Sequence, residues 1–411
     1  MNPTEDRPLA MTDLVSIPAP RLPRLVDPRA RLVDRLIARL AVGTLRVVLP
    51  SGRVVQRSGP VPGPEATIVL HRWRALSRVL LGGDIAFGEA HVDGDWSSPD
   101  LVAFLRLAAR NLDALAPTVR GSAPLRLLAR LKHGLRPNSR RGSRRNIVAH
   151  YDLGNDFYRR WLDGTMLYSS ALYSPAATTL EAAQAAKLAR IGELLRLDGG
   201  ERVLEIGCGW GALAAHLAGR HGAEVTGLTI SPSQLAFARE AVAAAGLAEA
   251  VDLRLQDYRD VSGTFDRIVS IEMFEAVGEA WWPTYFATIA DRLAPGGRAV
   301  LQVISIAEER FDAYRRDTDF IQHHVFPGGF LPSPSAFRRA AAAAGLAVVA
   351  SESFGLSYAE TLAEWRRRFH AAWDEIAGLG FDDRFRRLWD YYLAYCEAGF
   401  RAGAVDVGRG R

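Results

Sequence analysis

A glycine-rich turn near the middle of the chain carries the clearest signal for ligand chemistry. Residues 201–218 read ERVLEIGCGWGALAAHLA, an apolar strand that runs into three glycines and then a helix. Glycine allows positive φ and close approach of a ligand to the backbone, and a helix N-terminus offers free N–H groups. Dinucleotide-binding proteins favour G-x-G-x-x-G, whereas this turn has G-x-G-x-G preceded by Glu205. That pattern is typical of S-adenosylmethionine binding; a nicotinamide site and a merely structural turn are the alternatives.

The next strand and helix support the same kind of site. EVTGLTISPSQ ends a second strand at Thr229, and Ser231 follows as a predicted helix N-cap, with Gln234 completing a capping box. The acid that usually ends this strand is missing. Because ligands bind beyond the carboxyl ends of parallel strands, these side chains can cap the helix and still line a cofactor pocket.

Three further strands end in polar residues. The third ends at Gln256-Asp257-Tyr258, the fourth with Glu272 and Glu275, and the fifth with Gln302. Buried carboxylates at such strand ends are seldom only structural, although one of the two glutamates could simply hold a loop. We interpret Glu275 as the functional one.

The elements that position these residues divide the chain into four parts. Alternating strands and helices over 146–411 predict an α/β fold, a class I methyltransferase Rossmann-like sheet with flanking helices. Residues 30–115 predict a small N-terminal α+β domain with a hairpin turning at Ser51-Gly52 and a helix start at Ser98-Pro99. It offers no set of catalytic groups, so we expect it to be structural or to help address a membrane. Residues 1–29 predict a disordered lead-in and 116–145 a basic linker. The ending AGAVDVGRGR predicts an incomplete sheet edge.

Composition narrows the class of protein. The 411 residues are 48% hydrophobic, without an apolar run long enough to span a bilayer. Two cysteines are too few for a disulfide framework, no Cys/His cluster suggests zinc, and His323-His324 lacks further ligands nearby in sequence, so no metal is expected. We therefore expect a cytoplasmic location.

Positive charge is concentrated in the linker. Nine Lys or Arg residues lie between Arg120 and Arg145, and no acid occurs between Asp113 and Asp152. Such a block is either a solvated linker or a site of attraction to an anionic surface. A membrane and a nucleic acid are the two candidates for that surface.

Several motifs in order resemble a known family. They are HYDLGNDFYRRWLDGTMLYSSALYS, LEIGCGWGALA, LTISPSQLAFA, QDYRD, FDRIVSIEMFEAVG, FPGGFLPS and YYLAYCEAGFRAG. Together they resemble cyclopropane-fatty-acyl-phospholipid synthases and mycolic acid methyltransferases over roughly residues 145–405. QVISIAEERFDAYRR and the EAVG stretch look most like the plant-type branch.

The resemblance implies a set of cofactor contacts, which extends to Ala214 and Arg259. Glu205 is added to this set from the turn pattern. The predicted S-adenosylmethionine-binding residues are then Tyr168, Ser169, Glu205, Ile206, Gly207, Cys208, Gly209, Trp210, Gly211, Thr229, Ile230, Ser231, Gln234, Asp257 and Tyr258.

The resemblance also implies a bicarbonate site and a catalytic set. The bicarbonate site would involve Ser170, Glu275, Gln302, Ile304 and Tyr358, and Cys396 matches a cysteine regarded as the family's active-site residue. We interpret Cys396 as a core residue, because the reaction needs no nucleophile. Many family members have Cys at position 170 and His at position 302. Glutamine cannot titrate and holds an anion less firmly than an imidazolium.

The implied reaction is transfer of a methyl(ene) group from S-adenosylmethionine to the cis double bond of an unsaturated phospholipid acyl chain. Methylation of an alkene leaves a carbocation, so the pocket must be dry and a base must remove a proton. Proton loss from the new methyl gives the expected cyclopropane; loss from a neighbouring carbon gives a methyl-branched or methylene chain. The base is bound bicarbonate or one of the carboxylates. Candidate walls that stabilise the cation are Tyr168, Tyr173, Phe274 and Tyr358.

The expected partner is unsaturated phospholipid at an anionic membrane surface, and no nucleic acid is expected. The protein is expected to be cytoplasmic and peripherally associated with the inner face of the membrane. A homodimer is a further possibility. Residues 307–339 mix aromatic and basic side chains and are expected to form part of an acyl tunnel, with Arg315-Arg316 near the lipid phosphate, or else a plain surface helix and turn. The alternatives are a small-molecule N-methyltransferase of the coclaurine type, an RNA-binding methyltransferase and a non-catalytic binding protein.

Overall fold

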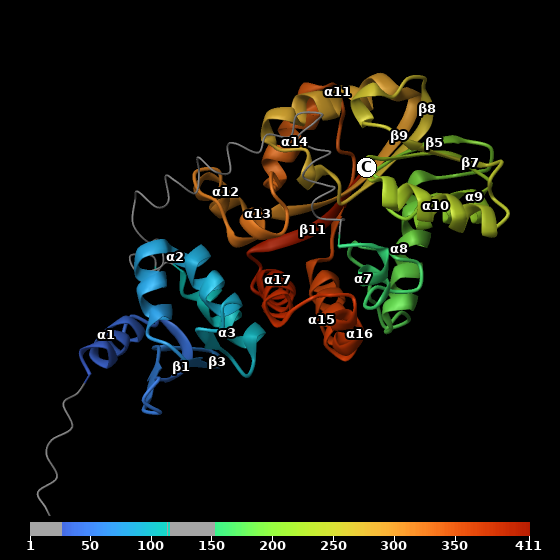
Figure 1. Ribbon diagram of the computed structural model, residues 1–411. Helices are drawn as coiled ribbons and strands as arrows, with labels where there is room; N and C mark the ends of the chain where they lie inside the picture. The colour runs from blue at the N-terminus through green and yellow to red at the C-terminus, as the bar shows by residue number, and fades with distance from the viewer. Residues whose placement is uncertain (1–26, 113, 116–152) are drawn as a thin grey trace, which may run out of the picture.

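The computed structural model describes residues 27–112, 114–115 and 153–411 (Figure 1). Most of the predicted lead-in and the whole basic linker lie outside these residues. Helix α1 begins at Pro28, with Asp27 as its N-cap. The prediction of disorder up to residue 29 is therefore wrong at its end, because a proline at the first helical position and a capping carboxylate start the helix earlier.

The larger part of the chain is built on a seven-stranded sheet of order β10-β11-β9-β8-β5-β6-β7. Strands β5 to β9 pair in parallel, which confirms the predicted α/β class. The strands are β5 (Arg202–Ile206), β6 (Glu224–Thr229), β7 (Val251–Leu255), β8 (Phe265–Ile271), β9 (Leu293–Ile306), β10 (Ser351–Ser353) and β11 (Val405–Gly410).

The C-terminal strand completes the sheet edge, so the prediction of an incomplete edge is wrong. Strand β11 lies between β9 and β10 and is antiparallel to both. Its sequence, VDVGRG, contains two glycines that disfavour a strand when considered locally. Pairing along β9 and complete burial of Val407 override that local preference.

Helices flank both faces of the sheet, and three short 3₁₀ turns follow strand ends. The helices are α7 (Asn155–Arg159), α8 (Leu180–Leu195), α9 (Ala212–His221), α10 (Pro232–Ala244), α11 (Trp282–Arg292), α12 (Glu308–Tyr314), α13 (Phe320–His324), α14 (Pro334–Ala343), α15 (Gly355–Ala371), α16 (Trp373–Gly378) and α17 (Asp383–Arg401); the turns are η1 (Tyr258–Asp260), η2 (Phe274–Ala276) and η3 (Glu279–Trp281).

The start of α10 confirms one part of the capping prediction and corrects another. The Ser231 hydroxyl accepts from the Gln234 backbone N–H, as an N-cap does. The capping box is absent from this helix start, because the Gln234 side chain accepts from Thr229 Oγ1 instead. The Ser231 N–H donates to the same Thr229 oxygen.

The N-terminal part forms its own four-stranded sheet of order β2-β1-β3-β4. The predicted hairpin joins β1 and β2, whereas β3 runs parallel to β1. Helix α3 is capped by Asp100, so its predicted start at Ser98-Pro99 is two residues early. The further elements are α1 (Pro28–Ile37), β1 (Val42–Val48), β2 (Val54–Ser58), β3 (Val61–Leu70), α2 (Arg74–Val92), β4 (Trp96–Ser97) and α3 (Leu101–Arg110).

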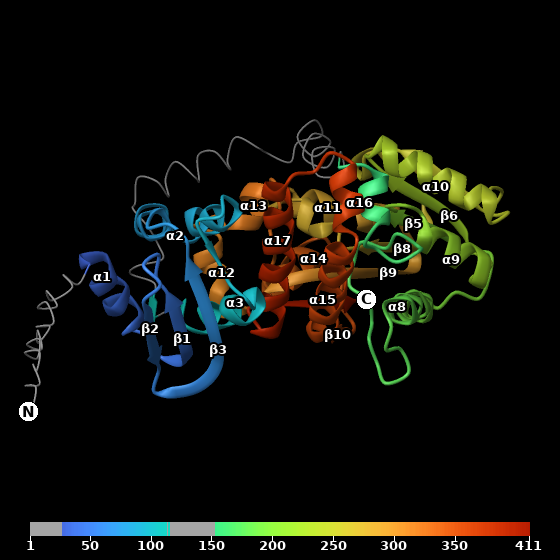
Figure 2. The ribbon, with the colours of Figure 1, turned by 60° about the horizontal axis from the view of Figure 1, so that its bottom comes forward.

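The N-terminal domain packs on α13 and α17, which lie between it and the large sheet (Figure 2). Its apolar core includes Phe320 of α13 and Tyr391, Ala394 and Ala398 of α17. The two parts of the chain therefore share one continuous core across their junction. None of the helices described here is both long and apolar enough to cross a membrane.

Candidate active site

The glycine turn follows β5 and has the backbone that its sequence predicts. Gly207, Gly209 and Gly211 have φ of 87°, 52° and 87°. A Cβ on Gly207 would lie 2.9 Å from Met273 Cγ, and one on Gly211 would lie 3.0 Å from Ala238 Cβ. At Gly209 no such neighbour is present, since this residue faces the open cavity. The turn is thus closely packed against the protein at Gly207 and Gly211 and open to the cavity at Gly209.

Glu205 is an acidic group without a full set of partners at the base of this turn. Its side chain is buried, and Oε2 has no hydrogen-bond partner among the described residues. Burial raises the pKa of Glu205 to about 8. An unsatisfied buried carboxylate beside a glycine cradle fits a cationic ligand, and S-adenosylmethionine carries positive charge on its sulfonium and ammonium groups.

Most of the predicted cofactor residues meet in one cavity. Twelve of the fifteen line it: Tyr168, Ser169, Glu205, Gly207, Cys208, Gly209, Trp210, Thr229, Ile230, Gln234, Asp257 and Tyr258. Ile206, Gly211 and Ser231 are not lining residues and support the turn and the helix from behind.

Two side chains on the walls of this cofactor region are held in place by their neighbours. The Trp210 indole donates to Asn155 Oδ1 at 2.8 Å, which fixes α7 over the glycine turn. Asp257 accepts from the Arg259 guanidinium at 2.8 and 2.6 Å. That guanidinium lies over the rings of Tyr258 and Trp281.

Glu272 is the most heavily coordinated carboxylate of the site. Oε1 accepts from the Ser170 backbone N–H at 2.8 Å and from Gln302 Nε2 at 2.7 Å. Oε2 accepts from the Tyr358 hydroxyl at 2.7 Å. Burial raises the pKa of Glu272, and these three hydrogen bonds, with the Lys187 charge, oppose that rise. Three donors therefore favour the ionised form of this group.

The backbone of Glu272 is strained. It has φ of 51°, in the left-handed region that few non-glycine residues adopt. Strain of this kind persists where the surroundings over-determine a conformation, and here it turns the carboxylate into the cavity.

Glu275 lines the same cavity but is less well bonded. One oxygen accepts from the Ile304 backbone N–H, and Oε2 has no partner among the described residues. Burial, with the nearby charge of Glu272, raises the pKa of Glu275 to about 8. At neutral pH Glu275 accordingly favours its protonated form.

The five residues expected to bind bicarbonate are divided in the structure. Glu275, Ile304 and Tyr358 line the cavity, whereas Ser170 and Gln302 are fully buried and do not. Ser170, Gln302 and Tyr358 all donate to Glu272, whose carboxylate is an anion held by these donors. The bicarbonate site stays a prediction.

Cys396 lines the cavity on α17, and burial raises the pKa of its thiol far above the usual range. Its sulfur has no hydrogen-bonding base among the described residues, so nothing there stabilises a thiolate. This environment matches that of a wall residue.

Three contributors escaped the sequence prediction. Glu272 was seen at a strand end but Glu275 was preferred. Lys187 of α8 is fully buried, burial lowers its pKa to about 7, and Nζ donates to Ser169 Oγ at 2.7 Å. Arg409 of β11 donates to Gln302 Oε1 at 2.7 Å. In the sequence, Lys187 is weakly marked as a functional residue, because it is a cation on an otherwise apolar helix face. Arg409 is not marked at all, because its strand was not predicted.

The cavity as a whole, including the cofactor region, is broad and mostly apolar, with a volume of about 1190 Å³. Tyr168 and Tyr358 line it as expected, whereas Tyr173 and Phe274 do not. Phe274 packs instead into an aromatic cluster with Trp282. Arg315 pairs with Glu279 outside the cavity, so the arginine of α12 that reaches the lining is Arg310.

Comparison with known proteins agrees with this geometry. The family model for mycolic acid cyclopropane synthetase matches residues 138–409. Tuberculostearic acid methyltransferase of Mycobacterium tuberculosis is 40% identical over 98% of this chain and 96% of its own. Cyclopropane-fatty-acyl-phospholipid synthase of Escherichia coli is 39% identical over 81% of this chain and 84% of its own. The solved structure of mycolic acid cyclopropane synthase CmaA1 complexed with SAH and CTAB is 31% identical, with a TM-score of 0.61, and covers 65% of this chain and 96% of its own.

Proposed function

The chain belongs to the mycolic acid cyclopropane synthetase family of S-adenosylmethionine-dependent methyltransferases, and from that membership we propose that it alkylates the cis double bond of an unsaturated phospholipid acyl chain. The observation that carries the proposal is Glu272, a carboxylate fixed by three donors inside an apolar cavity that is continuous with the glycine turn.

When bound, S-adenosylmethionine supplies an electrophilic methyl group. Glu205, Gly207 and Gly209 would hold it, and Trp210 and Tyr258 would line its site. The apolar lining excludes water from the cation that forms on the acyl chain. The rings of Tyr168 and Tyr358 offer π faces to that cation.

Glu272 is the proposed base. It removes one proton from the alkylated chain, and the Tyr358 hydroxyl and the Gln302 amide orient its carboxylate. Glu275, with its pKa of about 8, keeps its own proton at neutral pH and does not compete. A general base of this kind contributes roughly 10²–10⁴-fold to rate.

Cyclopropane formation is the first candidate outcome, in line with the E. coli and mycolic acid synthases. A methyl-branched or methylene product is the second. It is favoured by the relative that matches 98% of this chain, which is named a methyltransferase. The same base serves a cyclopropane and a methyl-branched alkene, since these differ in which carbon loses its proton. A methylene product also needs a 1,2-hydride shift before the proton is lost.

Phospholipid substrates also suggest where the enzyme works. The basic segment between Arg120 and Arg145 would draw it to the anionic cytoplasmic face of a membrane. The crystallisation of CmaA1 with CTAB, a detergent with a long alkyl chain, supports an apolar ligand for this cavity.

A product assay tests the proposal. Purified protein is incubated with S-adenosylmethionine and vesicles of phosphatidylglycerol with oleoyl chains, and the released fatty acid esters are analysed by gas chromatography and mass spectrometry. A chain heavier by one CH2 supports lipid alkylation, since a methyl is added and a proton is lost in each outcome, and its fragmentation separates ring from branch. An unchanged lipid pool with cofactor bound would overturn it and favour an N-methyltransferase.

A further inference from the structure

The cavity of the active site continues into the N-terminal domain. Its volume of about 1190 Å³ exceeds the roughly 300–1,000 Å³ of common small-molecule sites. Twenty described residues of the N-terminal domain line it, and Asp84 is the only polar one among them. Examples from its four main walls are Leu36 of α1, Val47 of β1, Leu76 of α2 and Ala108 of α3.

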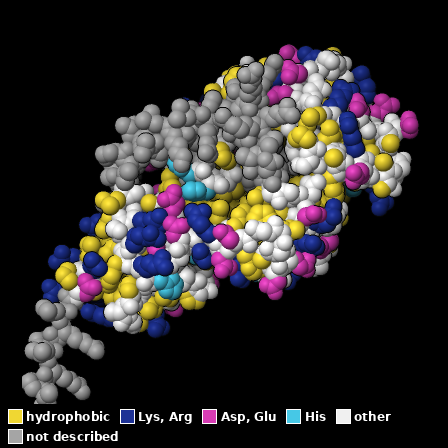
Figure 3. Space-filling model, in the orientation of Figure 1, with side chains coloured by type: hydrophobic (Ala, Val, Ile, Leu, Met, Phe, Trp, Pro, Cys, Tyr) yellow, Lys and Arg dark blue, Asp and Glu magenta, His cyan; other side chains and the backbone are white. Residues whose placement is uncertain are grey.

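An open space of this kind is unusual inside a small domain. Protein interiors are close-packed, with few voids larger than a water molecule. Val47 and Leu76 are buried residues of the domain core and yet line the cavity. Hydrophobic side chains are also visible where this domain adjoins the rest of the molecule (Figure 3). The core thus leaves room for an apolar ligand.

Helices α13 and α17 connect this space to the chemistry. Ile321, Tyr391, Tyr395 and Cys396 line the stretch between the N-terminal domain and Tyr358. The lining of the cavity therefore extends from the glycine turn into the N-terminal domain, with Asp84 and Asp319 close to Tyr395 on the way. Apart from Asp84, Lys187, the two glutamates Glu272 and Glu275, and the cofactor region, the charged lining residues belong to α12 and the residues just after it: Glu309, Arg310, Asp317 and Asp319.

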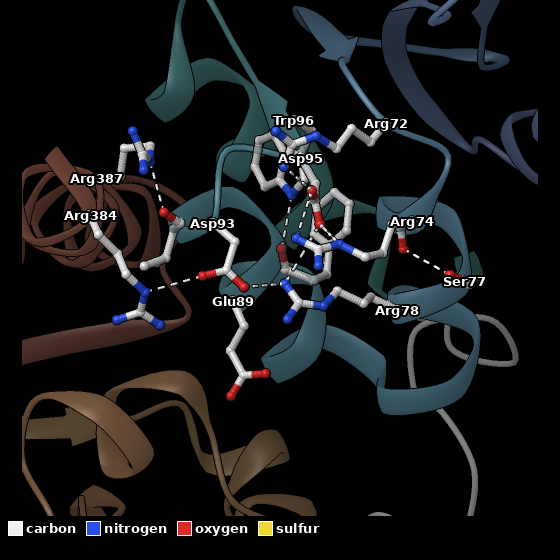
Figure 4. Close-up of polar contacts among 12 residues, drawn as sticks. Arg72, Arg74, Ser77, Arg78, Glu89, Asp93, Asp95, Trp96, Arg384 and Arg387 are labelled. Carbon is white, nitrogen blue, oxygen red and sulfur yellow. Dashed lines mark hydrogen bonds and ion pairs between the residues drawn. The ribbon is translucent and has the colours of Figure 1, made fainter.

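The N-terminal domain is held firmly at this junction. Arg384 Nε of α17 lies 3.1 Å from Asp93 Oδ1, and Arg387 Nε donates to the Val92 carbonyl at 2.7 Å (Figure 4). On the neighbouring face, a Cβ on Gly88 of α2 would lie only 2.6 Å from the Phe320 ring. This close packing fixes the distance from the domain's cavity to Glu272.

We propose that the N-terminal domain is a binding site for the methyl-terminal segment of the acyl chain whose double bond reacts. The inference rests on the proposed function. A methyl terminus needs no polar partner, and Asp84 is the only polar group among the described lining residues of the domain. Because the cavity is fixed relative to Glu272, the depth of the domain sets how far from the methyl end a double bond can lie.

Two variants narrow the cavity from opposite helices. Ala108→Trp on α3 and Val79→Trp on α2 fill it, while Ala38→Trp adds the same side chain at an exposed position outside the lining. Each is assayed with palmitoleoyl, cis-vaccenoyl and oleoyl phosphatidylglycerol; oleoyl has the longest segment beyond the double bond. We expect kcat/KM for oleoyl to fall on the order of tenfold relative to the other two in both filling variants, with Ala38→Trp unchanged. An equal effect on all three chains in the variants that retain the wild-type circular dichroism spectrum would overturn the proposal.

Binding of cis-parinaric acid, followed by its fluorescence, separates this inference from the proposed function. We expect the filling variants to weaken its binding at least about tenfold, and Ala38→Trp to leave it intact. If the wild type alkylates no lipid but still shows this pattern, the proposed function fails and the apolar site stands. If neither filling variant changes binding, the site assignment falls whatever the activity.

Discussion

Arg409 Nε donates a hydrogen bond of 2.7 Å to Gln302 Oε1, and the two residues are cross-strand partners on β11 and β9. With its oxygen occupied in this way, the Gln302 amide presents Nε2 to Glu272 at 2.7 Å. A guanidinium on one side and a carboxylate on the other allow only this orientation of the amide. Arg409 of the C-terminal strand thereby orients the Glu272 carboxylate, the proposed base, through the Gln302 amide that lies between them.

Removal of this guanidinium should slow the reaction without affecting the cofactor. In Arg409→Met we expect kcat to fall on the order of tenfold and the affinity for S-adenosylmethionine to be unchanged. A buried acceptor left without its donor should also lower the free energy of unfolding by about 1–3 kcal/mol. Arg190→Met is the matched control, because Arg190 pairs with the same Glu352 but does not touch Gln302. Equal losses of kcat in both variants would refute the positioning role.

Neutralising the proposed base should abolish most turnover. Glu272→Gln keeps the shape, and the Tyr358 hydroxyl can turn from donor to acceptor, so the fold should be retained. We expect kcat to fall by roughly 10²–10⁴-fold. Glu275→Gln should cost far less, because Glu275 is already protonated at neutral pH. Single-turnover rates with saturating cofactor measure both, and the reverse order of losses would move the base to Glu275.

Cofactor binding should strengthen as pH rises toward 8. The pKa of Glu205 in the free protein is about 8, so at neutral pH the group is mostly protonated. A cationic ligand prefers the ionised carboxylate, and binding then releases a proton. The dissociation constant should fall by up to about tenfold per pH unit below 8 and level off above it.

Isothermal titration calorimetry in two buffers of different ionisation enthalpy counts the released proton directly. In Glu205→Gln the component of proton release that belongs to this group should disappear, and the affinity should be weaker at pH 8. An unchanged number of released protons in that variant would rule out Glu205 as their source.

The glycine turn should tolerate no side chain at position 211. Gly211→Ala combines a φ of 87° with a contact of 3.0 Å to Ala238 Cβ. We expect a loss of about 1–3 kcal/mol in stability and weaker cofactor binding. Gly246→Ala, with φ of 70° and no atom near the new Cβ, isolates the backbone strain. Urea denaturation compares the two; if they lose the same amount, the contact with Ala238 contributes nothing.

Cys396→Ala should keep most of the activity. The thiol has a raised pKa and no base beside it among the described residues, and the proposed mechanism uses no nucleophile. Initial rates should change by less than a factor of about three, since only a small side chain of the cavity wall is lost. Loss of turnover comparable to that of Glu272→Gln would give Cys396 a chemical role.

Local pattern was sufficient for much of this protein. The G-x-G-x-G turn, the Ser231 cap and the alternation of strands and helices depend on interactions among residues close in sequence. For that reason they predicted the parallel sheet and a glycine turn suited to S-adenosylmethionine, whereas most of the individual cofactor residues came from the family resemblance. The hairpin at Ser51-Gly52 belongs to the same class.

Contacts between distant segments decided the rest. The sequence placed Glu272 and Glu275 at one strand end, but the choice between them depends on donors from Ser170, Gln302 and Tyr358, which lie far away along the chain. Strand β11 forms only because β9 is there to pair with it, and it brings Arg409 to Gln302. The cavity in the N-terminal domain arises where two apolar cores meet over α13 and α17. Hydrophobic periodicity along the sequence does not predict whether such a core is completely filled.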